Sequence, residues 1–345
     1  MIMNTNPLNS NNGITVPTRR IGRFSITDKL GKGSNGTVFL GHDPVIDRDV
    51  AIKILSTTVG IADKKQREQQ FINEARAAGR LSHPNIVTIY DASSEGGATF
   101  IAMEFLQGKD LREIMASGKR FDIIEIANII SKIAEALAYA HDHGVIHRDI
   151  KPANIFILPN NQPKVVDFGI ARMPNRVLDD NGQPAKTLFN NNILGTPNYM
   201  SREQAMGQQV NALTDVYSLG VVMYEMLTQQ KPFQSHDIDN LLHQIAHKIP
   251  KSPSKVSPNV PEKLSYIVMK AMQKDPVARY KNADEMAQAL QKFLMRDKRL
   301  KHRRVEASQA RNKESSVSSE KSTLFWLSCV ALLIVIGVVL SSMMR

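Results

Sequence analysis

The sequence has almost none of the cysteine on which small extracellular domains depend. Its single cysteine, Cys329, excludes a disulfide framework and any all-cysteine zinc site. Residues 1–17 also lack the basic segment and apolar stretch of a secretory signal peptide, so the body of the chain is expected in the cytosol. Hydrophobic residues at 42% and charged residues at 22% are close to globular averages, which excludes a mainly disordered, collagen-like or fibrous chain.

Positive charge is in excess, and most of the excess lies near the C-terminal end. The 44 lysines and arginines outnumber the 33 acids by 11, and residues 291–322 carry ten basic and four acidic residues. No charge lies in the apolar segment 324–344 that follows. At ~1.5 Å per residue a helix of this length spans about 30 Å, which predicts a transmembrane helix. A buried core helix is the alternative, but such helices usually keep a polar face.

The basic flank predicts the orientation and the partner of this span. The positive-inside rule places residues 291–322, and everything before them, in the cytoplasm. Since only Arg345 follows the span, we expect a single-pass, tail-anchored protein without an external, ligand-sensing domain. A nucleic-acid-binding arm is the rival interpretation of the basic run. Its position beside a span favours anionic lipid headgroups instead, and no nucleic-acid partner is expected.

Four segments are predicted along the chain, and no internal repeat is present. Residues 1–23 are a flexible leader, 24–294 a folded body, 295–323 a basic, serine-rich tether, and 324–344 the transmembrane helix. The folded body alternates apolar segments with turn residues. The tether is polar and charged throughout, which is typical of a linker.

A glycine-rich turn opens the folded body. Gly31, Gly33 and Gly36 follow an apolar stretch, and strand-like segments at 37–40 and 50–55 come after them. A G-x-G-x-x-G pattern alone also fits a dinucleotide site, but such a site needs a helix directly after the glycines. Glycines let a backbone approach phosphates closely, and Lys53 in the later strand is positioned to reach the same phosphates.

Residues 64–81 are predicted to form a helix with one apolar face. Its apolar residues recur at spacings of three and four: Phe71, Ile72, Ala75, Ala78 and Leu81. Glu74 lies beside that face. A helical glutamate is usually a solvated surface acid, so only a partner such as Lys53 would give it a role.

Two later segments complete a set of ordered motifs. His147-Arg148-Asp149 with Asn154 is followed by Asp167-Phe168-Gly169. With the glycine turn, Val50-Ala51-Ile52-Lys53 and the helix glutamate, five separated motifs stand in one order. On these motifs the sequence resembles the eukaryotic-type protein kinases and, within them, the bacterial Hanks-type serine/threonine kinases.

This resemblance covers residues 24–294 and implies an α+β, two-lobed protein kinase fold. A small, mainly antiparallel β N-lobe with one key helix would span about 24–104, and a larger, mainly α C-lobe about 107–294. The C-terminal transmembrane helix would be added to it. A bacterial inner membrane is the expected location.

The resemblance also implies roles in phosphoryl transfer, which needs mainly positioning and charge neutralisation. Asp149 would orient the substrate hydroxyl or accept its proton, and Lys151 would stabilise the transferring phosphate. Asn154 and Asp167 would hold Mg²⁺, with Mn²⁺ as an alternative, because such ions prefer hard oxygen ligands.

An ATP site is implied as well. Lys53 would contact the phosphates while paired to Glu74, beneath the three glycines. Met103 would be the gatekeeper, with the backbone of Glu104 and Leu106 facing the adenine. The apolar residues expected around the base are Leu30, Val38, Ala51 and Phe156. Alternatively, Val38, Ala51 and Phe156 are ordinary residues of the hydrophobic core.

The segment after Asp167 bears on substrate and regulation. Lys151 and Thr196, in Gly195-Thr196-Pro197, match the serine/threonine pattern, so protein Ser/Thr hydroxyls are the expected acceptors. Thr187 is the expected autophosphorylation site, and Arg148 would bind its phosphate.

Two further residues are expected to be structural. Asp215 would bond the backbone of the catalytic loop, and Arg279 would pair with Glu203. Where the family usually has Ala-Pro-Glu, this chain has Ser201-Arg202-Glu203, which loses the fixed φ of proline and adds a charge. The change puts peptide docking in doubt more than catalysis.

An active, membrane-tethered Ser/Thr kinase is the favoured function, because every catalytic position is filled. A nucleotide-binding pseudokinase or scaffold module is the alternative. It would predict the loss of a catalytic residue, and its only support is Ser201-Arg202. A homodimer is kept as an open alternative, although no pair of small residues with the spacing of a helix-dimer motif stands out in the span.

Overall fold

The computed structural model describes residues 20–33, 36–56, 61–168 and 197–299. The chain divides into two units, residues 1–291 and 292–345. Thr187, Thr196 and the predicted span at 324–344 lie outside the described residues. Within the described part, no helix is both long and apolar enough to cross a membrane.

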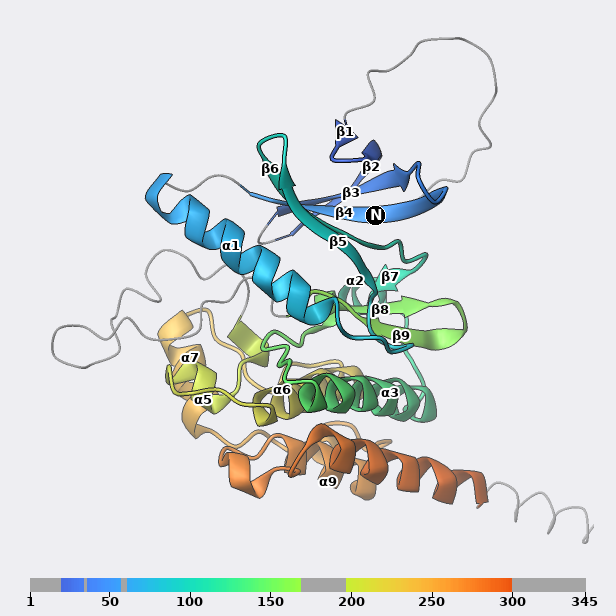
Figure 1. Cartoon of the computed structure of the whole chain (residues 1–345). Coiled ribbons are helices and arrows are strands. Elements are labelled where there is room, and N and C mark those ends of the chain that lie inside the picture. Colours follow the sequence, from blue (N-terminus) through green and yellow to red (C-terminus); the bar gives the residue numbers. More distant parts are fainter. Residues whose placement is uncertain (1–19, 34–35, 57–60, 169–196, 300–345) are drawn as a thin grey trace, which may run out of the picture. The chain divides into compact units, whose positions relative to one another are not determined.

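A six-stranded antiparallel sheet forms the first part of the larger unit (Figure 1). Its strands are β1 (Arg20–Ile21), β2 (Phe24–Gly33), β3 (Gly36–Asp43), β4 (Arg48–Leu55), β5 (Ile89–Glu95) and β6 (Ala98–Glu104), in the order β1-β2-β3-β4-β6-β5. Since β1 pairs with β2 at Ile21 and Phe24, the prediction of a leader up to residue 23 is wrong in its last residues.

The core of this sheet comes from residues of high β propensity. Phe24, Ile52 and Phe100 are fully or almost fully buried, and the rings of Phe24 and Phe100 meet edge to face at 5.8 Å. One helix, α1 (Ile61–Ala78), packs against β5 and β6 through Phe71 and Ala75. The apolar face predicted for residues 64–81 is therefore the face that binds the sheet.

Helices make up most of the second part of the unit. They are α2 (Leu111–Ala116), α3 (Ile123–Asp142), α5 (Arg202–Ala205), α6 (Leu213–Thr228), α7 (Ile238–His247), α8 (Pro253–Val256) and α9 (Glu262–Ala271), with 3₁₀ turns at Pro152–Asn154, Pro159–Asn161, Pro197–Tyr199 and Pro276–Ala278. Residues 283–291 are also helical. Helix α6 lies at the centre of these helices, because it packs on both α3 and α9 and is buried along almost its whole length.

The segment that carries the catalytic motifs leads from α3 into a small sheet. Asp122 and Glu125 form a capping box that fixes the start of α3. Gly144 has a positive φ of 75° just after the helix, which turns the chain toward the strands. The strands are β7 (Lys109–Asp110), β8 (Ile155–Leu158) and β9 (Gln162–Val165), in the order β7-β8-β9. Sheet-rich and helical parts thus follow one another as the predicted two-lobed fold requires.

Candidate active site

Asp215, near the start of α6, anchors the catalytic loop. Its carboxylate is fully buried and accepts hydrogen bonds from the backbone N–H groups of His147 and Arg148, each at 2.8 Å. The Nε2 atom of His141 lies 2.8 Å from the same carboxylate. A buried carboxylate needs such partners, because an unpaired one would be strongly disfavoured. Asp215 therefore bonds the backbone of the catalytic loop at two successive residues.

His147 joins the catalytic loop to the segment of Asp167. Its Nδ1 accepts the backbone N–H of Asp149 at 3.2 Å, so Nε2 carries the proton and donates to the carbonyl of Val166 at 2.9 Å. The ring also packs on Phe168, with centroids 4.8 Å apart. These contacts fix the two motifs against each other.

The side chain of Asp149 is held by the two residues predicted to act beside it. Lys151 Nζ lies 2.6 Å from Asp149 Oδ2. The amide nitrogen of Asn154 donates to the carbonyl of Asp149 at 2.8 Å and to its Oδ2 at 3.2 Å. Since the nitrogen of the amide is used in this way, its oxygen is the atom left to serve a metal ion.

Lys53 does not form the ion pair that the sequence predicted. Its Nζ lies 2.7 Å from Asp167 Oδ2, and among the described residues no ion pair or hydrogen bond joins it to Glu74. Lys53 is almost fully buried, so it pairs with the carboxylate that lies within its reach. Burial by itself would raise the pKa of Asp167, but the charge and hydrogen bond of Lys53, together with smaller effects of His147 and Lys151, lower that pKa. In this conformation Asp167 replaces Glu74 as the partner of the lysine.

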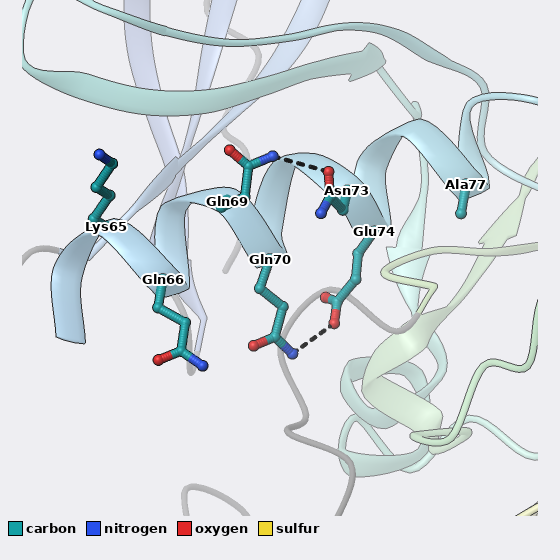
Figure 2. Close-up of a pocket in the computed structure, with 7 residues that line it drawn as sticks. All are labelled: Lys65, Gln66, Gln69, Gln70, Asn73, Glu74 and Ala77. Atoms are coloured by element: carbon teal, nitrogen blue, oxygen red, sulfur yellow. Dashed lines mark hydrogen bonds between the residues drawn. The ribbon is translucent and has the colours of Figure 1, made fainter.

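Glu74 lies on a polar side of α1 and bonds within its own helix. Figure 2 shows Gln70 donating to Glu74, at 3.0 Å, while the second carboxylate oxygen is buried without a hydrogen bond. Burial raises the pKa of Glu74 to about 6, against the lowering effects of Gln70, Arg148 and Lys53. The groove beside it, about 780 Å³, is lined by seven residues of α1 alone. It is therefore separate from the expected adenine site.

The residues predicted to surround the adenine gather in one apolar cluster. Its buried members are Ala51, Val87, Met103 and Val166, and the half-buried side chains packed on them are Leu30, Val38, Leu106 and Phe156. The cluster draws on both lobes, because Ala51 and Met103 face each other across β4 and β6 while Phe156 lies in β8. Val87 and Val166 are additions that the sequence analysis missed.

The three glycines of the first turn occur for different structural reasons. A Cβ on Gly36 would lie within 2 Å of the carbonyl oxygen of Ile54 in β4, so only glycine fits there. A Cβ on Gly31 would meet no atom within 4 Å. The packing of the strands therefore requires Gly36, whereas Gly31 faces open space. Gly33 pairs with Gly36 at the tip of the hairpin.

Glu104, at the end of β6, is tied to the C-lobe by a lysine that the sequence analysis overlooked. Lys164 of β9 is buried, and its Nζ lies 2.8 Å from Glu104 Oε2. The same nitrogen lies 3.4 Å from the carbonyl of Ile86. The sequence does contain a signal for Lys164, namely a charged residue inside the apolar run before Asp167. A lysine buried there needs a partner of opposite charge.

The chemistry of these side chains fits a magnesium nucleotide. Asn154 and Asp167 offer hard oxygen ligands, and the apolar cluster offers hydrophobic side chains against which a base could pack. Among the described residues, no group of three or more His, Cys, Asp or Glu side chains is placed to hold a metal.

Glu203 and Arg279 form the predicted ion pair. The guanidinium donates to both carboxylate oxygens, at 2.8 and 2.7 Å, and both side chains are buried. Thr214 donates to Glu203 as well, at 2.8 Å. Burial would raise the pKa of Glu203, but the hydrogen bonds and charge of Arg279 lower it below its usual value.

The unusual Ser201-Arg202 pair has a local structural role. Ser201 is the N-cap of α5, and its Oγ accepts the backbone N–H of Gln204 at 3.3 Å. The side chain of Gln204 returns a bond to the backbone N–H of Ser201 at 3.0 Å, which completes a capping box. The Ser201 cap thus starts α5 with arginine, not proline, as the first helical residue.

A small cavity beside Asp149 collects residues from the catalytic loop and from the segment before α5. It is lined by Arg148, Asp149, Ile150, Lys151, Tyr199, Met200, Gln204 and Ser218. Tyr199, Met200 and Gln204 were missed by the sequence analysis. Only Gln204 left a signal, namely the Ser-x-x-Gln spacing of a capping box.

Comparisons with known proteins agree with this geometry. Residues 24–295 match the family described as protein kinase domain. The chain is 37% identical over 274 residues to a probable serine/threonine-protein kinase, SCO3848, of Streptomyces coelicolor, covering 78% of this chain and 40% of the relative. It is 36% identical to the serine/threonine-protein kinase PrkC of Bacillus subtilis, covering 77% of this chain and 39% of the relative.

A solved structure shows the same fold. The crystal structure of the PknI kinase domain of Mycobacterium tuberculosis matches with a TM-score of 0.62 at 24% identity, over 81% of this chain and 99% of that chain. The chain spans about two fifths of the length of the curated relatives that it matches. On the family match and on the motifs that the fold brings together, the chain belongs to the protein kinase domain family.

Proposed function

We propose that the chain is an ATP-dependent serine/threonine protein kinase that transfers the γ-phosphoryl group to protein Ser/Thr hydroxyls. The observation that carries the proposal is the arrangement around Asp149. Lys151 and Asn154 hold its carboxylate, and Asp167, the metal ligand, is held by Lys53. The names of the curated relatives support the choice of Ser/Thr acceptors.

Each residue has a task that its contacts support. Asp149 faces the cavity beside Tyr199 and Met200, where it would orient a substrate hydroxyl and take its proton. The ammonium group of Lys151, which lies beside Asp149, would turn to the transferring phosphoryl group and stabilise its negative charge. Bound Mg²⁺ would neutralise phosphate charge, and the oxygens of Asn154 and Asp167 would hold it. The apolar cluster around Ala51 and Met103 would exclude water from the base.

The test is transfer of labelled γ-phosphate from ATP with Mg²⁺ to a generic protein substrate. We expect label on Ser and Thr, and its loss in both Asp149→Asn and Lys53→Met. A wild-type chain that binds ATP but transfers nothing would favour the alternative, a nucleotide-binding pseudokinase. The specific observation behind that alternative is that, among the described residues, no hydrogen bond or ion pair joins Glu74 to Lys53.

Regulation by autophosphorylation is part of the proposal. Thr187 is the proposed site, and it rests on sequence position alone. Arg148 is the expected reader of its phosphate, and the Nε of Arg148 is buried without a hydrogen bond, so a new acceptor would satisfy it. Phosphopeptide mapping of an active preparation should find phosphate on Thr187, and a Thr187→Ala variant should be less active.

A membrane location is also proposed, again from sequence. The apolar segment 324–344 would span the membrane, and the basic segment 291–322 would lie against anionic headgroups on the cytoplasmic side. The chain should float with liposomes, and a variant lacking 324–345 should not. If the truncated variant floats only with anionic liposomes, the basic segment alone is sufficient for binding.

A further inference from the structure

Both ends of the peptide group between Arg148 and Asp149 are fixed by side chains. Its N–H, which belongs to Asp149, donates to His147 Nδ1 at 3.2 Å. Its carbonyl oxygen, which belongs to Arg148, accepts a hydrogen bond from Gln204 Nε2 at 2.8 Å. Because a peptide group is planar, these two bonds set the plane from which the side chain of Asp149 departs.

The backbone at this point has a conformation that needs support. Arg148 has a φ of 65°, in the left-handed region that side chains other than glycine rarely adopt. Asp215 holds the N–H of Arg148 at 2.8 Å, on one side of this residue. Gln204 holds its carbonyl on the other side. Without the donor from Gln204, no described side chain bonds that carbonyl, and the peptide is held only at its N–H end, by His147.

The other end of the same amide bonds the wall of the cavity beside Asp149. Gln204 Oε1 accepts the N–H of Ser201, and this N–H belongs to the peptide between Met200 and Ser201. One side-chain amide therefore bridges two peptide groups, Met200–Ser201 and Arg148–Asp149. Met200 and Asp149 line the same cavity. The orientation of the amide is unambiguous, because one partner is a donor and the other an acceptor.

We propose that Gln204 is a positioning residue for the proposed kinase reaction, which holds the Arg148–Asp149 peptide and couples the orientation of Asp149 to the substrate wall at Met200. This inference rests on the proposed function. A catalytic carboxylate must be held to within fractions of an ångström, and a misplacement of about 1 Å is worth on the order of 100-fold in rate. Gln204 touches no reacting atom, so its effect passes through Asp149.

The decisive variant is Gln204→Glu in the full-length chain. A carboxylate still accepts from Ser201, so the cap of α5 is kept, but it has no donor for the carbonyl of Arg148. Ser201→Ala is the matched control for the cap, because it removes the acceptor of the Gln204 backbone N–H and leaves the side-chain bridge in place. Gln209→Ala, at an exposed glutamine nearby, controls for a general surface change.

We expect Gln204→Glu to lower kcat for a protein substrate about 10- to 100-fold, with the KM for ATP unchanged within about twofold. Ser201→Ala should show a clearly smaller loss of kcat, and Gln209→Ala none. The split between kcat and KM supplies the second readout. A general loss of structure would weaken ATP binding together with kcat, whereas a positioning role leaves the KM for ATP unchanged.

Two results would overturn the inference while leaving the proposed function intact. One is an active Gln204→Glu variant with the kcat of the wild type. The other is a loss of kcat accompanied by a comparable loss of ATP binding, since that loss would be structural. A wild-type chain that transfers no phosphate would instead overturn the proposed function, and the inference with it.

Discussion

Lys53 Nζ lies 2.7 Å from Asp167 Oδ2, so a strand of the N-lobe and the predicted metal ligand of the C-lobe are joined by an ion pair. Lys53 lowers the pKa of Asp167 against the effect of burial. This relationship connects phosphate binding, metal binding and pH, and it can be tested through each of them.

The first prediction concerns Lys53→Met. Without the lysine, burial acts unopposed by its charge, so the pKa of Asp167 rises and its carboxylate is protonated at a higher pH. Mg²⁺-dependent binding of a fluorescent ATP analogue should therefore be lost at a higher pH in the variant than in the wild type. Lys53→Arg keeps the charge and is the control. Equal pH midpoints in all three proteins would contradict the pairing of Lys53 with Asp167.

A second prediction separates stability from activity at Glu74. Its pKa is raised to about 6 from 4.5, so the folded state binds more protons than the unfolded state between these values. Stability should then fall as the pH rises from about 4.5 through 6. Glu74→Gln mimics the protonated form, so its Tm should exceed that of the wild type at pH 7 to 8.

Below pH 4.5 the Tm advantage of Glu74→Gln should vanish, because the wild-type carboxyl is protonated there. If Glu74 also has the proposed role with Lys53 during the reaction, the same variant should lose transfer activity while it gains stability. Gln69→Glu, on the same helix and exposed, is a control for added or removed charge. A Tm difference that does not change with pH would contradict the assignment.

A third prediction concerns the buried pair of Glu203 and Arg279. Removing one partner leaves the other charge buried, and Arg279→Leu should lower the free energy of unfolding by about 3–5 kcal/mol. Arg112, whose side chain is largely exposed, pairs with Asp110, and Arg112→Leu should cost only about 0–1 kcal/mol. Urea unfolding measures both variants. Equal, small losses would show that burial does not strengthen the first pair.

The same pair predicts an acid-sensitive component of stability. The pKa of Glu203 is lowered below 4.5, so its contribution is present above that pH and is lost as the pH falls through the native value. The stability difference between the wild type and Arg279→Leu should therefore shrink in acid. A difference that stays constant down to pH 3 would exclude this ion pair as the cause.

The sequence predicted the members of the site better than their contacts. Asp149, Asn154 and Asp167 are identified by motif spacing, and Asp215 and Arg279 have the partners expected for them. The partner of Lys53 was wrong, because spacing along the chain does not say how far α1 lies from β4. Gln204 and Lys164 bond partners 56 and 60 residues away, and a local pattern can mark such a residue without identifying its partner.

A fourth prediction tests the departure at Arg202. Arg202 is the first residue of α5, where proline is favoured because its missing N–H needs no partner. Ser201 before it is extended, with φ −74° and ψ 166°, which a following proline accepts. Arg202→Pro should therefore unfold at a denaturant midpoint equal to or above that of the wild type. Ser201→Ala, which removes the cap, should lose about 1 kcal/mol. A large loss in Arg202→Pro would show that the arginine side chain is needed.

The last prediction concerns Lys164 and Glu104, whose ion pair joins β9 to the end of β6. Lys164→Met keeps the length of the side chain but leaves Glu104 without its cation, and the bond to the carbonyl of Ile86 is lost as well. Because the backbone of Glu104 is expected to face the adenine, the KM for ATP should change more than kcat does. Stability should fall by about 1–3 kcal/mol, the cost of polar groups left without partners. The double variant Lys164→Met/Glu104→Gln removes the unpaired charge and should recover part of that stability without restoring the KM. Recovery of both would mean that the charge alone mattered, and that the link between the two strands does not position the nucleotide site.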